Sequence, residues 1–239
     1  MRYRSNPTTF KKSRPQLNRD NSFRFWEGRI TDSSNRLLLL LIALTTFIGV
    51  FPLLDVPLLF GGILNLIILA ALSGTSEQKI TRRPVIILAI APLVAFAIQR
   101  GGFEWVGQIG FVLAFVFFMY VVLVLLQRVM RADDIEAEII YGAVSCYLII
   151  GLAWTMLFHA LYEINPASFS YGEHELLTFY DFLYYSFVSL TTLGYGDLTP
   201  VSDFAKALAV IEAVIGVFYI GAIISRLVSL YGRRSGVGS

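Results

Sequence analysis

The chain has 239 residues, of which 56% are hydrophobic and 15% are charged, and its formal net charge is +2 at pH 7. Soluble domains carry about 25% charged residues, so this composition excludes an ordinary soluble protein and predicts an integral membrane protein. We expect membrane lipids as its surroundings and no nucleic-acid partner.

The first 35 residues form a basic, polar segment that contains Pro7 and Pro15. We interpret residues 1–35 as a largely disordered cytoplasmic segment. Its Lys and Arg side chains either bind anionic lipid headgroups or serve only to set the topology. No cleavable signal is expected, because the basic region is too long and no small-residue cleavage site follows the apolar stretch.

Several long apolar stretches follow this basic segment. They predict an all-α membrane protein with about six transmembrane helices. The first three stretches are short or interrupted by proline and glycine. The six expected spans are residues 37–54, 58–73, 84–99, 105–127, 139–162 and 204–231.

Basic residues gather before the first expected span, after the second and fourth, and after the last, whereas most acids lie in the other connections. Cytoplasmic loops carry the excess of Lys and Arg. With an even number of spans, both termini are therefore expected in the cytoplasm, which suits the cell membrane, plasma or inner.

The fourth expected span, residues 105–127, contains no arginine. A voltage-sensing helix needs several arginines within the membrane field, so residues 36–128 are expected to form a four-helix membrane region without sensor charges. Arg128 and Arg131 come after the span and are followed by four acids, and we interpret residues 129–138 as an interfacial cytoplasmic linker helix. The four helices then form a scaffold, a lipid contact or a sensor of another stimulus.

Residues 191–197 read Thr-Thr-Leu-Gly-Tyr-Gly-Asp and lie in a polar notch between two apolar stretches. Backbone carbonyls and a threonine hydroxyl can replace the hydration shell of a cation, and Gly194 and Gly196 permit the backbone angles that this needs. An isolated Gly-Tyr-Gly is more often a surface turn. Here, however, residues 179–190 are too short to span a bilayer, and re-entrant backbone survives only where protein or a water-filled path satisfies it. The context therefore predicts a pore.

This motif resembles the selectivity filter of the tetrameric potassium channel family, which usually reads Thr-Val-Gly-Tyr-Gly-Asp; Leu193 replaces the valine. The resemblance implies that residues 139–232 form a pore domain of outer helix, re-entrant pore helix, filter and inner helix, followed by a short tail at 233–239. It also implies a homotetramer, because one filter strand cannot encircle an ion. The implied K+ ligands are Thr192, Leu193, Gly194 and Tyr195, with Gly196 completing the filter.

The resemblance also implies residues that support the filter. Two tyrosines stand where many relatives have tryptophans: Tyr184 is expected to reach Asp197, and Tyr185 to brace Tyr195, with Thr191 at the base of the filter. The alternative is an ordinary aromatic belt at the membrane interface. Asp197 is also a candidate for attracting cations to the pore mouth.

The last expected span carries candidate gating residues. Gly216 lies twenty residues beyond Gly196, where family members often place a hinge glycine, and Gly221 is a second candidate; the alternative for Gly216 is close helix packing. One helical face would line the cavity and its lower constriction. Its residues are Val217, Ile220, Ile224 and Val228.

Two charged residues of the last span are expected within or near the membrane. Glu212 is an acid at membrane depth, which is costly and indicates a function. It either faces the pore or accepts hydrogen bonds from the pore helix, from Ser189 or a tyrosine. Arg226 is interpreted as a residue that extends to the inner interface.

Enzyme chemistry is not expected. Cys146 is the single cysteine, and His159 and His174 are the two histidines, too few for a metal site of usual composition. We expect no cofactor, with K+ only as the transported ion. The leading hypothesis is a potassium-selective channel subunit that conducts passively and is not conventionally voltage-gated. The alternatives are a weakly selective cation channel and a non-conducting accessory subunit.

Overall fold

The computed structural model describes residues 19–50, 79–99, 102, 104–132, 136–172 and 176–235. The expected span at 58–73 and the end of the one at 37–54 lie outside these residues. The chain divides into two compact units, residues 1–32 and residues 33–239. The packing described below is that of the second unit.

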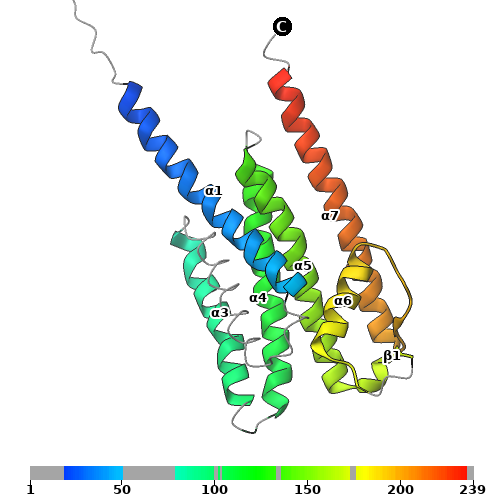
Figure 1. Cartoon of the computed structure of the whole chain (residues 1–239). Coiled ribbons are helices and arrows are strands. Elements are labelled where there is room, and N and C mark those ends of the chain that lie inside the picture. The colour runs from blue at the N-terminus through cyan, green and yellow to red at the C-terminus, as the bar shows by residue number, and fades with distance from the viewer. Residues whose placement is uncertain are drawn as a thin grey trace, which may run out of the picture. The chain divides into compact units, whose positions relative to one another are not determined.

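The described part is mainly helical (Figure 1). Its helices are α1 (Arg19–Val50), α3 (Lys79–Gln99), α4 (Glu104–Arg131), α5 (Ala137–Ile164), α6 (Phe179–Leu190) and α7 (Asp203–Ser235). Three of them contain segments long and apolar enough to cross a membrane: Trp105–Arg131, Ala137–Ile164 and Asp203–Leu230. Asn35–Val50 and Ile86–Ala95 are shorter apolar helices. A mainly helical membrane protein is therefore confirmed, and the count of six spans stays a prediction.

Two boundaries differ from those expected from the sequence. Residues 19–35 belong to α1 instead of an irregular segment, because no proline follows Pro15 there and polarity alone does not prevent a helix. Of the linker helix expected at 129–138, residues 133–135 lie outside the described residues. Its first three residues continue α4, and α5 begins at Ala137.

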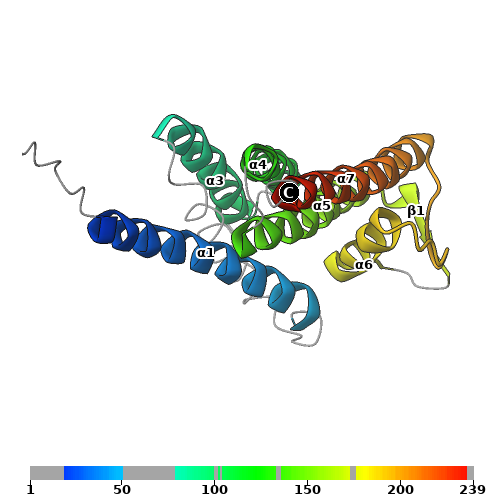
Figure 2. The same ribbon diagram turned by 90° about the horizontal axis from the view of Figure 1, so that it is seen from above.

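The helices of the second unit pack in sequence order, with α4 against α3 and α5, α5 against α6, and α6 against α7 (Figures 1 and 2). Helix α5 lies at the centre. In its most apolar stretch 72% of the residues are buried, against 11% for the corresponding stretch of α7. The core is largely aromatic and aliphatic, and its most buried side chains include Leu40, Phe117, Phe118, Ile149, Phe158 and Phe182.

A two-stranded antiparallel sheet joins β1 (Phe169–Tyr171) to β2 (Leu198–Pro200), with Ser170 opposite Thr199. A 3-10 turn, Pro166–Ser168, precedes β1, and the amide of Val201 donates to the carbonyl of Ser168 at 2.8 Å. The sheet therefore fixes the chain that follows residues 191–197 to the chain that precedes α6. The all-α prediction missed it, because three-residue strands are too short to show an alternating pattern.

Candidate functional site

Helix α6 positions the segment 191–197. It begins with a capping box, in which the Thr178 amide and hydroxyl donate to Asp181 Oδ2 at 2.6 and 2.7 Å. Its buried face carries Phe182, whose ring meets those of His159 and Phe169 at centroid distances of 5.6 and 5.1 Å. Twelve helical residues span about 18 Å, less than the roughly 30 Å of a bilayer core.

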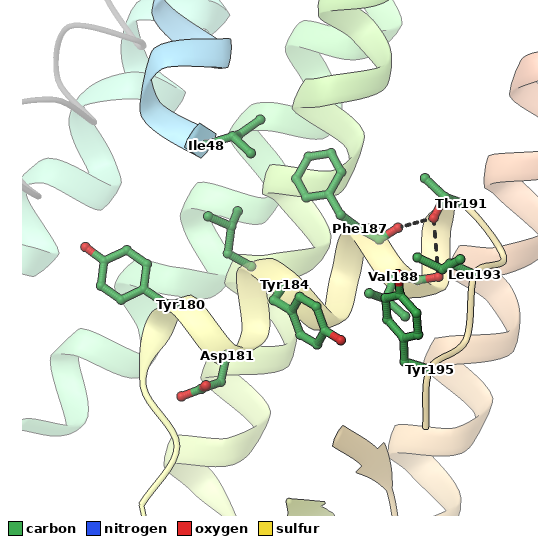
Figure 3. Close-up of a pocket in the computed structure, with 10 residues that line it drawn as sticks. Ile48, Tyr180, Asp181, Tyr184, Phe187, Val188, Thr191, Leu193 and Tyr195 are labelled. Atoms are coloured by element: carbon green, nitrogen blue, oxygen red, sulfur yellow. Dashed lines mark hydrogen bonds between the residues drawn. The ribbon is translucent and has the colours of Figure 1, made fainter. Parts of the chain in front are cut away.

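The chain after α6 is hydrogen-bonded back onto the end of that helix. The Leu193 and Gly194 amides donate to the carbonyl of Val188 at 2.9 and 3.3 Å, and the Thr192 amide donates to that of Ser189 at 3.0 Å. The Thr191 hydroxyl donates to the carbonyl of Phe187 at 2.6 Å (Figure 3). The backbone amides of Thr192, Leu193 and Gly194 therefore all have acceptors at the end of α6. Within the described residues, the carbonyls of 192–196 accept no hydrogen bond.

The backbone dihedral angle φ changes sign from residue to residue along this loop. Thr192, Gly194 and Gly196 have φ of 60°, 60° and 78°, whereas φ is not positive at Leu193 and Tyr195 between them. Such alternation brings successive N–H groups to one side of a strand, so the carbonyls face the other side. Residues 191–197 are all exposed. A row of carbonyls is thus presented to the outside of the single chain.

Thr192 is the unexpected member of this pattern. The sequence analysis assigned the unusual angles to the two glycines, yet a β-branched residue also adopts positive φ here. That conformation is strained and costs about 1–3 kcal/mol. No feature of the sequence marks this strain, because it depends on the hydrogen bonds that hold the loop.

Tyr184 supports the loop from α6. Its hydroxyl donates to Asp197 Oδ2 at 2.7 Å, and its ring stacks on that of Tyr195 with 6.3 Å between centroids and 4° between planes. The hydrogen bond from Tyr184 holds the pKa of the Asp197 carboxyl below its usual value. The same bond raises the pKa of Tyr184 to about 12. The Tyr184–Asp197 bond implied by the family resemblance is thus present.

Tyr185 does not take the role expected of it within the chain. Its ring is buried against Phe158 and Phe169, with centroids 5.0 and 5.7 Å away. Successive helical residues differ by about 100° in direction. Tyr184 therefore faces the loop, whereas Tyr185 faces the core.

Glu212 of α7 points toward α6. Its Oε1 lies 2.5 Å from the hydroxyl oxygen of Ser186, and the side chain is fully buried. Of the two orientations considered from the sequence, the structure has the one toward α6, the helix expected to be the pore helix. The partner is Ser186, one turn before the expected Ser189.

Gly216 packs against the end of α6. A Cβ at this position would lie 2.1 Å from the carbonyl oxygen of Leu190, and α7 continues through Gly216 without a break. The structure therefore favours close packing over a hinge. Gly221, by contrast, has open space around the position of a Cβ.

The two sides of α7 differ in environment. The buried positions form one stripe: Ala205, Glu212, Gly216, Ile223 and Leu230. The candidate cavity-lining residues lie on the exposed side: Val217, Ile220, Ile224 and Val228. An exposed apolar stripe along a membrane helix is available for lipid, for another copy or for a pore.

Arg226 makes a contact that the sequence analysis did not predict. Its guanidinium donates to the carbonyl of Ala132, just after α4, and the side chain is half-buried. Nearby, Arg128 pairs with Glu138 across the α4–α5 connection. The C-terminal half of α7 is thereby joined to the end of α4.

A cavity of ≈ 570 Å³ runs along α6 beside the loop. It is mainly apolar, with Ile48 of α1 at one end (Figure 3). Its other lining residues include Tyr180, Tyr184, Phe187, Thr191, Leu193 and Tyr195.

Among the described residues, no cluster of three His, Cys, Asp or Glu could hold a metal ion. Cys146 is buried and free. His159 lies in the aromatic cluster around α6, and His174 falls outside the residues that the structure describes.

Two functional candidates were missed from the sequence. Ser186 was not singled out, since a serine within an apolar stretch gives no sign of its partner. Asp181 was not singled out either, although the spacing Thr-x-x-Asp before an apolar run is a capping-box signal. That signal was sufficient to find it.

A known protein family matches the part of the chain that contains this loop. Residues 143–233 match a protein family described as "Ion channel". The chain is 29% identical to Protein LctB of Bacillus caldotenax over 114 residues, covering 45% of this chain and 83% of LctB. No solved structure matches.

Two plant proteins are also similar over shorter stretches. Two pore potassium channel b of Oryza sativa subsp. japonica is 48% identical over 46 residues, which cover 19% of this chain and 13% of that protein. Two pore potassium channel c of the same plant is 32% identical over 83 residues, 35% of this chain and 18% of that protein. The chain thus covers under a fifth of each plant relative. With the apolar helices, these matches indicate that the chain is a membrane protein of the ion-channel type and not an enzyme.

Proposed function

We propose that the chain is the subunit of a potassium-selective channel that conducts K+ passively through a homotetrameric pore. The observation that carries this proposal is the alternating backbone at Thr192, Gly194 and Gly196 on an exposed loop, whose row of carbonyls accepts no hydrogen bond from the described residues. Such oxygens can replace the hydration shell of K+. The potassium channels among the similar proteins support the choice of ion.

The homotetramer is supported by surfaces that a single chain leaves uncovered. Helix α7 exposes an apolar stripe, and the filter residues Leu193 and Tyr195 are 55% and 67% exposed. Four copies around one axis would surround each ion with carbonyls. The next copy would then cover the apolar side of α6, including the cavity described above.

The orientation follows from the distribution of charge. Basic residues predominate in the connections assigned to the cytoplasm, so we place both termini there and the filter toward the outside of the cell membrane. The basic segment at 1–35 would then lie near anionic headgroups. Helix α4 carries its arginines only in its last turn, and the channel is therefore not of the usual voltage-gated type.

The test is ion flux in liposomes that contain only this protein, with equal K+ and Na+ gradients. We expect K+ flux to exceed Na+ flux, and Gly194→Ala to abolish the difference, because alanine at positive φ displaces the carbonyls. The matched control is Gly172→Ala, a glycine with φ of 48° outside the filter. It carries similar backbone strain and should leave selectivity intact.

The alternatives give different results in the same experiment. Equal K+ and Na+ fluxes would indicate a weakly selective cation channel, in which Leu193 loosens the filter. Assembled tetramers without flux in either gradient would indicate a non-conducting accessory subunit. Loss of selectivity in the Gly172→Ala control would show that general strain, not the filter, is measured.

A further inference from the structure

We propose that Glu212 works as a neutral carboxylic acid, and that a hydrogen-bond chain from Glu212 through Ser186 to the Gly151 carbonyl positions the pore helix and hence the filter. The proposal rests on the potassium-channel function proposed above. It assigns Ser186 and Glu212 as positioning residues for ion selection, instead of groups that meet the ion.

The first argument is a count of hydrogens. The Ser186 hydroxyl oxygen lies 2.8 Å from the Gly151 carbonyl oxygen and 2.5 Å from Glu212 Oε1. Two oxygens this close need a hydrogen between them. A serine hydroxyl has one hydrogen, and the carbonyl has none to give. The second hydrogen must therefore come from Glu212, which donates from Oε1 to Ser186 while Ser186 donates to Gly151.

The second argument is the environment of the carboxyl group. Glu212 and Ser186 are both fully buried. Within the described part of the chain, no Lys or Arg pairs with Glu212, and Oε2 has no hydrogen-bond partner. The titratable side chains near it are the phenols of Tyr147 and Tyr185. A buried charge without a partner is far more costly than a buried neutral acid.

The third argument is the position of the chain of bonds. It joins α5 through Gly151, α6 through Ser186 and α7 through Glu212, so all three helices of the matched channel segment meet there. Ser186 lies half a turn before Val188, whose carbonyl accepts the Leu193 and Gly194 amides of the filter. A rotation or shift of α6 would therefore move the filter backbone directly.

This packing also leaves little freedom for α6. A Cβ at Gly151 would lie 2.6 Å from the ring of Phe187, next to Ser186, and Gly216 touches the last carbonyl of α6. The hydrogen-bond chain lies between these two close contacts. Because hydrogen bonds are directional, the chain fixes the rotation of α6 about its axis more closely than packing alone would.

The test compares Glu212→Gln with Glu212→Met and Ser186→Ala in liposome flux. An amide keeps both a donor and an acceptor, so Glu212→Gln should keep the K+/Na+ flux ratio of the original protein. Glu212→Met and Ser186→Ala break the chain and should lower that ratio about tenfold, the equivalent of one buried hydrogen bond. Asp203→Asn, an exposed acid in the first turn of the same helix, is the control for losing a carboxylate.

The result that overturns the proposal is a Glu212→Gln protein as impaired as Glu212→Met, since the negative charge would then be the essential feature. An infrared measurement provides a readout that does not require conduction. The original protein should show the C=O band of a protonated carboxylic acid at neutral pH, and Glu212→Gln should lack it. Absence of that band in the original protein contradicts the inference even if no variant conducts, whereas its presence without K+ flux contradicts only the channel function.

Discussion

The hydroxyl of Tyr184 lies 2.7 Å from Oδ2 of Asp197, while the ring of Tyr184 stacks on that of Tyr195. One side chain of α6 thus contacts both the aromatic residue of the loop and the acid that ends it. The amides at the start of the loop are held by the Val188 carbonyl, and its far end continues into β2. The loop is therefore fixed at its beginning, its middle and its end.

Removing the hydroxyl of Tyr184 should make ion flux more sensitive to acid. The bond from Tyr184 lowers the pKa of Asp197, so its contribution is present above the ordinary pKa of an aspartate and is lost as the pH falls through the lowered value. In Tyr184→Phe the pKa of Asp197 returns toward the ordinary value. We expect this variant to lose K+ flux at a higher outside pH than the original protein.

The measurement is K+ flux in liposomes as the pH on the filter side is lowered stepwise from 7. Tyr180→Phe removes a hydroxyl one turn earlier on α6 and serves as the control; its flux should follow the original profile. Identical acid profiles for Tyr184→Phe and the original protein would show that the hydrogen bond does not affect Asp197 during conduction.

Two glycines of α7 should respond differently to alanine. In Gly216→Ala the added methyl group would meet the Leu190 carbonyl, whereas in Gly221→Ala it would enter open space. We expect Gly216→Ala to lower the free energy of unfolding by about 1–3 kcal/mol, as overpacked cores do. Gly221→Ala should be neutral or slightly stabilising in a helix.

Thermal unfolding in detergent, followed by tryptophan fluorescence, would measure both variants. A hinge at Gly216 predicts another outcome, in which Gly216→Ala alters flux but leaves stability unchanged. That outcome would contradict the packing explanation.

The helices and the loop could be predicted from the sequence because both depend on local pattern. Long apolar stretches predicted α4, α5 and α7, since a membrane span needs about twenty apolar residues. The spacing of Gly194 and Gly196 predicted the positive φ values at these positions. Tyr184 could be assigned to Asp197 only through the family resemblance.

The partners of buried groups could not be predicted in this way. Glu212 meets Ser186 across 26 residues of chain, and Arg226 meets the Ala132 carbonyl across 94. Such contacts depend on the rotation of packed helices about their axes, and a rotation of about 100° exchanges neighbouring residues. The contact of Tyr195 with Tyr184, where Tyr185 was expected, has the same origin.

The capping box of α6 should contribute measurably to stability. The Thr178 amide donates to the Asp181 carboxylate, and a negative charge at this end of a helix is favourable. Asp181→Ala removes both effects and should cost about 1 kcal/mol of unfolding free energy. Asp203→Ala, in the first turn of α7, is the comparison. If both variants lost the same unfolding free energy, the interaction of the carboxylate with the helix dipole would explain the whole effect. That result would contradict a specific capping bond.

The bond from Arg226 to the Ala132 carbonyl should hold the C-terminal half of α7 against the end of α4. Replacing Arg226 by leucine removes a charged donor from a half-buried site. Hydrogen bonds to charged groups contribute about 1.5–3 kcal/mol, and a cation is favourable beside the carbonyls that end a helix. We therefore expect Arg226→Leu to lower the unfolding free energy by about 2 kcal/mol.

Arg131→Leu is the matched control, because Arg131 is an exposed arginine in the last turn of α4. A substitution at such a surface position should change stability by less than about 0.5 kcal/mol. If Arg226 only extended to the membrane interface, as expected from the sequence, the two leucine variants would lose the same small amount. A large loss in Arg226→Leu alone, with partial recovery in Arg226→Lys, requires a specific bond, because lysine keeps the charge but not the planar guanidinium.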